Sequence, residues 1–501
     1  MMYVKKANPK AWLLLWLGFL PFSSLAQQYT EPCGTGPAPS HIREFIQNID
    51  YTQAQAEDLQ TIYIPVTLHI VRSSNGGGGF LENEANLTIC DLNQRMASSG
   101  MFFHVPGPVN FIDDDLLYTP NSTTPLFGMI SSYNVPRTMN VYYTNLAQIS
   151  LCGFAFYPNS GPGGFQNNGA VVMSFACSQP NGTTLAHEVG HFFSLPHTFD
   201  QTSNNPQAIN AERVTRNFNE ISPRLSANCN TRGDGFCDTP ADFIGTRWSC
   251  PTGRIELDVN GDQFIPDASY YMSYSADACM SRFSDQQITA MRATLANTSA
   301  SRGYLLIPPF PNYLDLPLPP QQLRPTSNDT VVPNNALFSW NRIPGASRYQ
   351  VKIYLFNFAV LDTITTDTFY VSRARDIRNF REHSWEVRAL NGANLCTPFS
   401  PRVFFQSIGP QALSLNEVEQ DILKLHPNLL SEGDRLIISG LVPGIPFELL
   451  IFDLQGRKVF NHRAQAENQQ EALQLPWLEH GLYLTQLKQK DRSIAIKLRI
   501  H

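Results

Sequence analysis

The spacing of apolar residues changes several times along this 501-residue chain, and each pattern predicts a different element. Residues 62–71 (IYIPVTLHIV) alternate between apolar and polar side chains as a strand does. Residues 87–101 instead repeat apolar side chains at the spacing of a helix. Apolar stretches then alternate with loops rich in Gly, Asn and Pro as far as residue 297. We therefore expect a first folded domain of strands and helices at residues 61–300.

The second half of the chain predicts short strands. Proline is dense at residues 301–320, and because proline fixes φ, we expect an extended, semi-rigid linker there. Beyond it, ALFSWNRIPGASRYQVKIY and HSWEVRAL are typical of strands separated by turn residues, which predicts a small β-sandwich at residues 321–408. A second β-rich module is expected at residues 413–501, where Gln455-Gly456 suits a tight hairpin turn.

Composition excludes several classes of protein. The chain has 42 acidic and 36 basic residues, and this balance argues against nucleic acid as a partner, because binding phosphates requires clustered Lys and Arg. A hydrophobic fraction of 42% supports packed cores and excludes a largely disordered chain. No internal apolar run approaches the roughly 20 residues that a membrane span needs. We therefore expect a multidomain protein with no transmembrane span.

The first 26 residues have the features of an export signal peptide. Lys5, Lys6 and Lys10 precede an apolar stretch at residues 11–22 that is too short to span a bilayer. A buried core helix is the alternative, although such a helix rarely follows a lysine cluster at the start of a chain. We expect an exported protein in which the polar residues 27–60 form a propeptide. Export permits disulfides, and because nine cysteines is an odd number, at least one must be unpaired.

Residues 183–199 (TTLAHEVGHFFSLPHTF) are the most informative segment. His187 and His191 are four residues apart and therefore lie on one face of a helix, with Glu188 beside them. Two neutral imidazoles at this spacing can bind one zinc ion, and the carboxylate can accept a proton from a water on the metal. The pattern predicts a zinc site with its own general base.

A third histidine, His197, follows six residues after His191. In an unbroken helix those residues would add ~9 Å of rise and carry this imidazole away from the ion. The chain must therefore turn sharply just after Phe193, and Pro196 indicates that the helix does not continue. Three surface histidines without a metal are the alternative to this three-ligand site.

With the turn included, the segment resembles the metzincin metalloproteases, whose motif is HExxHxxGxxH, and within them the pappalysin-like (cytophagalysin, ulilysin) family. Ser194 stands where the family has a glycine in left-handed conformation, which costs a non-glycine residue roughly 1–2 kcal/mol. Residues 233–240 (GDGFCDTP) look like the family's GDxxCDTP segment, and residues 271–274 (YMSY) look like its Met-turn. Cys279 and the RFSDQQITAMR stretch continue the match. The resemblance covers residues 61–297 and implies an α/β metzincin catalytic domain.

The activity that this resemblance implies is that of a secreted zinc endopeptidase. Zinc on the three histidines lowers the pKa of a bound water towards ~7, and Glu188 takes the proton as the water attacks a peptide carbonyl. By resemblance, the Tyr274 hydroxyl helps the metal to stabilise the oxyanion, and Met272 lies beneath the zinc as a structural residue.

The alternative function is that of a non-catalytic surface adhesin in which the metzincin domain has become a binding module. Ser194 is the one sequence feature that favours it. The presence of Glu188 and Tyr274 speaks against it, because a domain that needs zinc only for folding has no use for a general base.

Cys33 lies in a Pro-Cys-Gly-Thr sequence ahead of the catalytic domain. Relatives carry a similar Cys-Gly motif whose thiolate caps the zinc, so the resemblance implies that Cys33 keeps the proenzyme latent. A disulfide to Cys90 and an idle thiol are the alternatives. The other cysteines of the catalytic domain are expected to form disulfides rather than a second zinc site, because export favours oxidation. We favour the pairs Cys152–Cys177, Cys229–Cys250 and Cys237–Cys279.

Two loops are candidates for a calcium site. Residues 258–262 (DVNGD) offer oxygen ligands at alternate positions, although a solvated turn explains them equally well. Resemblance to ulilysin-like relatives implies calcium near Asp234, Asp238 and Thr239.

The family pattern also places an acidic residue five positions after the Met-turn methionine, at the base of the pocket that receives the side chain following the scissile bond. In this chain that residue is Asp277. Its carboxylate would favour cleavage before Arg or Lys. The alternative is an aspartate that caps a turn.

The two C-terminal modules resemble known β-domains. Residues 321–408 look like a fibronectin type III domain with Trp340 and Trp385 in its core. The last module resembles the C-terminal sorting domain of the type IX secretion system. The resemblance rests on HPN at 426–428, LLIFDLQGRKVF, GLY at 481–483 and a last strand around Lys497. In this chain Leu429 replaces the final proline of the usual YPNP box. We therefore expect protein substrates and the type IX machinery as partners, release or anchoring at the cell surface, and a Gram-negative source of the Bacteroidota type. An ordinary adhesive β-module is the alternative.

Overall fold

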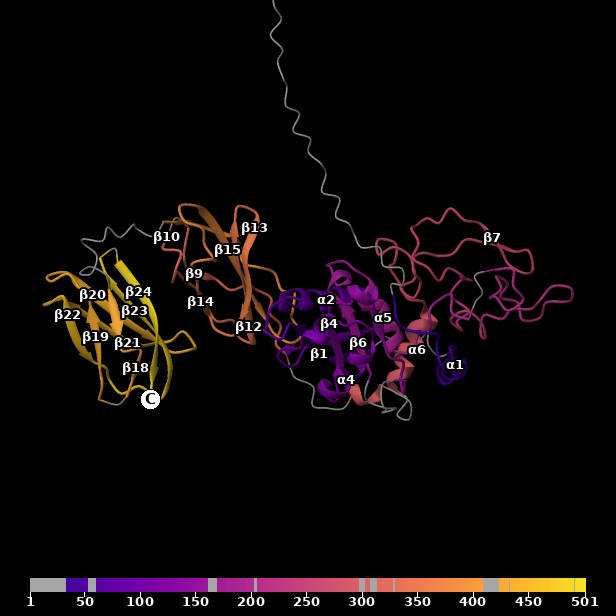
Figure 1. Cartoon of the computed structure of the whole chain (residues 1–501), viewed down its shortest axis with the longest axis horizontal. Helices are drawn as coiled ribbons and strands as arrows, with labels where there is room; N and C mark the ends of the chain where they lie inside the picture. Colours follow the sequence, from indigo (N-terminus) through magenta and orange to yellow (C-terminus); the bar gives the residue numbers. More distant parts are fainter. Residues whose placement is uncertain are drawn as a thin grey trace, which may run out of the picture.

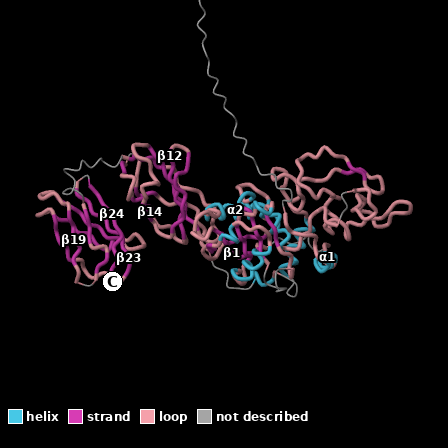
Figure 2. The backbone as a smooth tube through the Cα atoms, in the orientation of Figure 1, coloured by secondary structure: helices cyan, strands magenta, loops and turns pink. Residues whose placement is uncertain are grey.

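The computed structural model describes residues 33–52, 60–160, 169–201, 205–296, 302–306, 313–327, 329–408, 423–431, 433–490 and 492–501. The expected signal peptide at residues 1–26 lies outside these ranges. Figure 1 shows an α/β domain, a β-sandwich and a C-terminal β-module in a row, with a loop-rich segment at the far end that contains the short strands β7 (Glu256–Leu257) and β8 (Gln263–Phe264). Helices occur in the α/β domain and in the segment that precedes it, whereas the two C-terminal modules consist of strands and loops (Figure 2). Within the described residues, no helix is both long enough and apolar enough to cross a membrane.

The α/β domain is built on a sheet with the strand order β2-β1-β4-β6-β5, in which β3 also pairs with β1. All the pairs are parallel except β5 with β6. Every residue of β4 and β6 is buried, as expected for central parallel strands that are covered on both faces. The strands are β1 Ile62–Arg72, β2 Met101–His104, β3 Asn110–Asp113, β4 Met139–Thr144, β5 Gly153–Ala155 and β6 Ala170–Ser174.

Six α-helices belong to the described part of the chain: α1 Ser40–Gln47, α2 Glu82–Arg95, α3 Asp115–Tyr118, α4 Thr124–Tyr133, α5 Thr184–Phe192 and α6 Asp285–Ala296. The strand predicted at residues 62–71 is confirmed as β1. The helix predicted at 87–101 is wrong in its bounds, since α2 begins at Glu82 and ends at Arg95. A short 3₁₀ helix, Ala97–Ser99, follows, and Gly100 at φ 66° turns the chain into β2.

The main core lies where α2, α5 and α6 pack against the sheet, and its buried side chains include Ile89, Val189 and Met291. The chain returns to this core after α6, because Leu305 in the 3₁₀ helix Gly303–Leu306 is fully buried there. Arg302 is also buried, and its guanidinium donates to the carbonyl oxygens of Phe192 and Phe156. The packing of the first domain therefore includes residues 302–306.

The middle module is a sandwich of two sheets, with the strand orders β10-β16-β15-β12-β13 and β14-β11-β9. Phe338, Trp340 and Trp385 are buried between them, so the two tryptophans are core residues as expected. The strands are β9 Gln322–Arg324, β10 Thr330–Val331, β11 Leu337–Trp340, β12 Arg348–Leu355, β13 Phe358–Thr365, β14 Phe369–Val371, β15 Glu382–Leu390 and β16 Val403–Ser407.

The C-terminal module also has two sheets, with the orders β17-β19-β22 and β18-β24-β23-β20-β21. Gly456, at φ 76°, lies in the turn between β20 and β21, where the sequence predicted a hairpin. The strands are β17 Lys424–His426, β18 Leu429–Leu430, β19 Arg435–Ser439, β20 Pro446–Phe452, β21 Lys458–Gln465, β22 Gln470–Gln474, β23 Gly481–Gln489 and β24 Arg492–Ile500. The fold class is therefore an α/β domain followed by two β-sandwich modules.

The α/β domain and the middle sandwich are joined by a disulfide between Cys90 of α2 and Cys396, which follows β15. Around it, Glu82 of α2 forms an ion pair with Arg348 of β12 at 2.7 Å. The sandwich residue Leu395 is buried in the core of the α/β domain. This junction therefore has covalent, ionic and apolar components.

Candidate active site

α5 carries the first two predicted zinc ligands. Every residue from Leu185 to Phe192 is buried, because the helix lies between the sheet and the segment that contains Met272. His187 and His191 are one helical turn apart, and their imidazole Nε2 atoms are 3.1 Å from each other.

The chain turns sharply at Ser194, as predicted from the position of His197. Ser194 has φ 77°, which confirms the left-handed backbone expected at the place of the family's glycine. The Thr294 hydroxyl of α6 donates to Ser194 Oγ at 2.9 Å, and the Leu195 amide donates to Gly190 O at 2.9 Å. These contacts hold a backbone conformation that costs a serine ~1–2 kcal/mol. The turn brings His197 Nε2 to 3.0 Å from His191 Nε2.

The hydrogen bonds of two of the rings, His187 and His191, indicate that their Nε2 atoms are free to bind a metal ion. His187 Nδ1 donates to Tyr271 O at 2.6 Å, and His191 Nδ1 donates to Leu195 O at 2.7 Å. With these protons on Nδ1, the neutral rings carry only lone pairs on Nε2. Lone pairs that face each other at this distance repel unless a cation binds between them. The donor set, three neutral imidazole nitrogens, is one that zinc prefers.

Burial keeps these imidazoles in the form that binds metal. It lowers the pKa of His187 to about 4 and the pKa values of His191 and His197 well below the usual value for histidine. All three side chains are therefore neutral at pH 7, as metal ligands must be. The ligand atoms of Cys33 and the three histidines lie within 4.8 Å of one another and form the one such metal-binding group found in the described part of the chain.

Glu188 and Tyr274 lie beside this group. Glu188 is fully buried, and burial raises the pKa of its carboxyl to about 8. Glu188 Oε2 accepts a hydrogen bond from Thr35 Oγ1 at 3.2 Å, whereas Oε1 has no partner among the described residues. The Tyr274 hydroxyl donates to Cys33 O at 3.4 Å, and its ring packs against that of His197. Burial also raises the pKa of Tyr274.

The segment around Cys33 runs across this site. Cys33 is buried and is the one free cysteine in the structure, so the alternative of a disulfide to Cys90 is wrong. Cys33 forms a parallel bridge with Gly153 of β5, and the Gly34 amide donates to Gly153 O at 2.8 Å. Burial raises the pKa of the Cys33 thiol, and the charge of Glu188 acts in the same direction. Thr35, the last residue of the Pro-Cys-Gly-Thr sequence, donates to the predicted general base.

α1 attaches this segment to the catalytic domain. Ile42 and Ile46 are buried in the main core. Arg43 forms an ion pair of 2.8 Å with Asp200, whose carboxylate also accepts the Ala38 amide at 2.9 Å. Both side chains of the ion pair are largely buried, at 11% and 4% exposed. The segment from Cys33 to α1 is therefore packed as part of the domain.

The Met-turn, residues 271–274, lies against the middle of α5. Met272 is buried, and its sulfur packs against Gly190, between the two histidines of the helix. The Met272 carbonyl accepts the Thr198 amide at 3.1 Å, which ties the Met-turn to the residue after His197. Met272 therefore packs against the backbone of α5, as the resemblance implies for a structural residue.

A pocket opens beside Glu188, between the start of α5 and the residues that follow the Met-turn. Asp277 lies in it, and Asp277 Oδ1 accepts from Thr183 Oγ1 at 2.7 Å. Arg247, which the sequence did not mark, also lines the pocket, with Nη2 3.3 Å from the same oxygen. The other lining residues are Cys33, Thr184, His187, Ser273, Tyr274 and Met280.

The residues of the calcium candidates are engaged in protein contacts. Asp234 Oδ1 accepts a hydrogen bond from the Thr239 hydroxyl at 2.9 Å, and Asp238 Oδ2 accepts one from the backbone amide of Gln286 at 2.8 Å. Asp258 accepts two amides of its own loop, and Asp262 pairs with Arg224. Residues 258–262 thus form a turn closed by its own hydrogen bonds.

A buried carboxylate that the sequence did not mark lies next to Asp234. A Cβ added to Gly233 would overlap the Glu212 carboxylate, which places this side chain beside the Gly233-Asp234 backbone. Glu212 Oε1 pairs with Arg216 at 2.9 Å, but Oε2 is buried without a hydrogen-bond partner in the described structure. Burial raises the pKa of Asp234 to about 7.

The disulfides differ in part from those expected. Cys152 is bonded to Cys177, as predicted. The predicted pairs Cys229–Cys250 and Cys237–Cys279 are wrong, since the structure joins Cys229 to Cys237 and Cys250 to Cys279.

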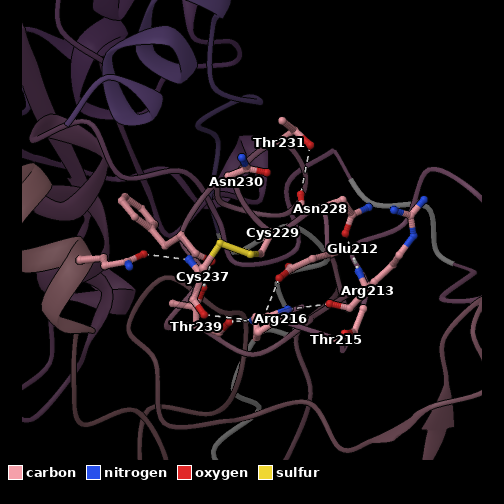
Figure 3. Close-up of a disulfide and its surroundings, with 12 residues drawn as sticks. Glu212, Arg213, Thr215, Arg216, Asn228, Cys229, Asn230, Thr231, Cys237 and Thr239 are labelled. Carbon is pink, nitrogen blue, oxygen red and sulfur yellow. Dashed lines mark hydrogen bonds and ion pairs between the residues drawn. A yellow bond between two sulfur atoms is a disulfide. The ribbon is translucent and has the colours of Figure 1, made fainter. Parts of the chain in front are cut away.

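Local folding explains the two corrected pairs. After Cys229 the chain folds back at once, because the Thr231 and Arg232 amides both donate to Asn228 O at 2.9 Å, and this turn brings Cys237 back to Cys229 (Figure 3). The next loop lies beside the end of the Met-turn, where the Trp248 amide donates to Tyr274 O at 3.0 Å. This contact leaves Cys250 near Cys279.

Comparisons with known proteins agree with this geometry. Residues 129–296 match the peptidase family described as pregnancy-associated plasma protein-A, and residues 434–501 match the secretion system C-terminal sorting domain. An extracellular metalloprotease of Arthroderma gypseum is 24% identical over 273 residues, which are 52% of this chain and 82% of the relative. One of Verticillium alfalfae is 29% identical over 253 residues, 47% of this chain and 78% of the relative.

Solved structures of a Tannerella forsythia peptidase also align with the chain. A promirolysin mutant aligns with a TM-score of 0.38 and 18% identity over 55% of this chain and 97% of its own. Mature mirolysin in complex with a cleaved peptide aligns with a TM-score of 0.36 and 19% identity over 50% of this chain and 96% of its own.

Three neutral imidazoles that converge on one point, in a domain with these family matches, identify a zinc metalloendopeptidase. More closely, residues 129–296 match the pappalysin peptidase family, and residues 434–501 match the C-terminal sorting domain of the type IX secretion system.

Proposed function

We propose that this peptidase is secreted as a latent proenzyme in which His187, His191 and His197 hold zinc and Glu188 is the general base. The observation that carries the proposal is the position of Glu188, which is fully buried next to His187 and lines the same pocket as His187 and Asp277. The zinc ion, when bound, acts as a Lewis acid that acidifies a water and polarises the peptide carbonyl.

The protein side chains transfer the proton, stabilise the oxyanion and position the metal. Glu188 accepts the proton of the attacking water and delivers it to the leaving amine, for which a pKa raised by burial is suited. The Tyr274 hydroxyl, now donating to the Cys33 carbonyl, is placed to donate to the oxygen of a substrate carbonyl instead. His187 and His191 are held by their Nδ1 hydrogen bonds, so the ligand geometry is preorganised.

Substitution of the base tests the mechanism. Glu188→Gln should retain zinc, because the three imidazoles are unchanged, while casein cleavage falls on the order of 10²–10⁴-fold. His191→Ala should lose the metal together with activity and serves as the matched control. A Glu188→Gln enzyme as active as the parent would disprove the assignment. A parent enzyme that binds zinc and cleaves no protein after propeptide removal would favour the adhesin alternative.

Latency is supported by the way residues 33–35 occupy the site. The Cys33 sulfur lies in the same group as the three zinc ligands, Thr35 engages Glu188, and the Cys33 carbonyl engages Tyr274. The segment thus blocks the metal, the base and the oxyanion donor together.

Cys33→Ala should therefore activate the full-length chain without proteolysis, because a thiolate displaced from zinc is replaced by water. Arg43→Gln, which weakens the ion pair to Asp200 but does not reach the metal, should activate it partly. A Cys33→Ala chain as inactive as the parent would contradict latency by this thiol, and peptide mapping would show whether Cys33 is free.

The pocket that contains Asp277 supports a preference for cleavage before Arg or Lys. It opens directly beside Glu188, and its carboxylate is partly desolvated, at 41% exposed. Asp277→Asn should relax the preference without abolishing hydrolysis. Profiling of cut sites in a peptide library measures this, and an apolar preference unchanged in the variant would contradict it.

We also keep calcium as a proposal, near Asp234, Asp238 and Thr239. The buried Asp234 and the unpartnered Glu212 oxygen beside it support a cation here, since buried carboxylates require compensation. Addition of calcium to a chelated sample should raise the melting temperature, and Glu212→Gln should diminish that rise. An equal rise in both chains would contradict the site.

The sorting domain at residues 434–501 implies the type IX machinery as a partner and a destination at or beyond the cell surface. We propose that the protein is released or anchored there after cleavage of a signal peptide at residues 1–26. A chain truncated before residue 413 should accumulate in the periplasm, and its appearance in the medium would contradict this route.

A further inference from the structure

The loop that carries Arg247 is fixed beside the substrate pocket. The Trp248 amide donates to Tyr274 O at 3.0 Å, and Trp248 forms a parallel bridge with Ser275. Three residues after Arg247, Cys250 is bonded to Cys279, which itself follows Asp277 by two residues. A backbone bridge and a disulfide therefore hold Arg247 and Asp277 on adjoining segments.

The two side chains meet inside the pocket. Arg247 Nη2 lies 3.3 Å from Asp277 Oδ1, and Thr183 Oγ1 donates to the same oxygen at 2.7 Å. The pair is 37% and 41% exposed, so the arginine can move outward into solvent without leaving a buried charge. Both residues line the pocket beside Glu188 and Tyr274.

The arginine changes what this pocket can select. A lone carboxylate would attract any cationic side chain, but here the guanidinium cancels its charge and occupies one of its oxygens. An entering Arg or Lys must displace Arg247 or share Asp277 with it. A neutral side chain needs no such exchange. The ion pair therefore reduces the difference in kcat/KM between substrates with a cationic and substrates with a neutral side chain after the scissile bond.

We propose that Arg247 is a specificity-determining residue, which holds Asp277 in an ion pair and so lowers the preference for a cationic side chain after the scissile bond. The inference rests on the proposed function of the pocket, because it concerns the same carboxylate. Arg247 acts on the substrate through charge and competition, not through the hydrolytic step.

Arg247→Gln tests this, measured on the enzyme after proteolytic removal of the propeptide, because in the full chain Thr35 and the Cys33 carbonyl still engage Glu188 and Tyr274. Removal of the arginine should raise kcat/KM on the order of fivefold for peptides with Arg or Lys after the scissile bond, and should leave peptides with Leu or Ala there unchanged. The increase should disappear when Asp277→Asn is added. Arg254→Gln is the matched control, because Arg254 follows on the same loop, pairs with Glu256 and does not line the pocket.

The outcomes separate the two proposals. An Arg247→Gln enzyme with equal changes for cationic and neutral peptides, or with none, overturns the inference while the proposed peptidase stands. An increase that survives in the Asp277→Asn background also overturns it. If no variant, including the parent without its propeptide, cleaves any peptide, the proposed function fails and the inference falls with it.

Discussion

Met272 packs directly against Gly190, in the middle of the helix that carries His187 and His191, two of the proposed zinc ligands. A Cβ at this position would overlap the Met272 sulfur and would also approach Phe283 at 3.4 Å. Because residue 190 has no side chain, the Met272 sulfur can pack directly against the backbone of α5.

Gly190→Ala should consequently lower the free energy of unfolding by about 1–3 kcal/mol, because overpacking shifts the helix away from Met272. It should also weaken zinc binding, since His187 and His191 move with the helix. Gly128→Ala in α4 is the control, because nothing lies within 4 Å of an added Cβ there, and it should raise stability by up to about 1 kcal/mol. Urea unfolding and zinc titration measure both variants. The packing argument fails if Gly190→Ala and Gly128→Ala change stability and zinc affinity equally.

Ser194 permits a direct measurement of backbone strain. At φ 77°, alanine and serine both carry the cost of a left-handed conformation, whereas glycine does not. Ser194→Gly should therefore be about 1–2 kcal/mol more stable than Ser194→Ala, since both variants lose the same hydrogen bond to Thr294. Thermal and urea unfolding would show this difference. Two variants of equal stability would mean that the turn relaxes.

His69 should make the α/β domain sensitive to acid. It is fully buried in β1, donates from Nε2 to Asn140 Oδ1 at 2.9 Å and stacks on Tyr142. Burial lowers its pKa to about 4, so between pH 4 and 6.5 the unfolded chain binds a proton that the folded chain does not. The free energy of unfolding that depends on a neutral His69 is fully present above pH 6.5. It is lost as pH falls towards 4, by up to about 3 kcal/mol.

His69→Gln cannot take up that proton. The unfolding free energy of the variant, measured in urea between pH 4 and 8, should therefore fall less steeply with acid than that of the parent. If the unfolding free energies of parent and variant fall in parallel with pH, His69 does not contribute to the acid sensitivity of the domain.

The disulfide between Cys90 and Cys396 should couple the unfolding of two domains. Replacement of both cysteines by serine should lower stability by about 2–5 kcal/mol and divide one calorimetric transition into two, because only non-covalent contacts such as Glu82–Arg348 then join the domains. Replacement of Cys152 and Cys177, both within the first domain, should lower stability without dividing the transition. A single transition in the first variant would contradict the coupling.

The zinc cluster could be predicted from the sequence because its geometry is local. The spacing of His187 and His191 on a helix, followed by Pro196, requires a turn before His197, and Ser194 adopts the backbone that such a turn needs. Features set by distant contacts could not be predicted. Arg247 belongs to no motif, and its place in the pocket depends on a bridge between Trp248 and Ser275.

The errors have similar causes. The helix predicted at residues 87–101 ran too far, because Met96, Ala97 and Met101 continue its apolar spacing, although a 3₁₀ turn follows Arg95 and Met101 begins β2. Cysteine pairs in the loop-rich segment depend on where the chain folds back, and no periodic pattern shows that. Cys90 was expected to pair with Cys33 if with any cysteine, yet its partner is 306 residues later in another module.

This last bond also sets an order of events during export. Cys90 cannot be oxidised with Cys396 until nearly the whole sandwich has entered the same oxidising compartment. The bond between the two domains therefore forms only after translocation of most of a module that contributes nothing to the proposed zinc site. A protein secreted with this disulfide closed carries the two domains covalently joined. Proteolytic removal of the sandwich would then require cuts on both sides of Cys396, and the peptide that contains Cys396 would stay attached to α2.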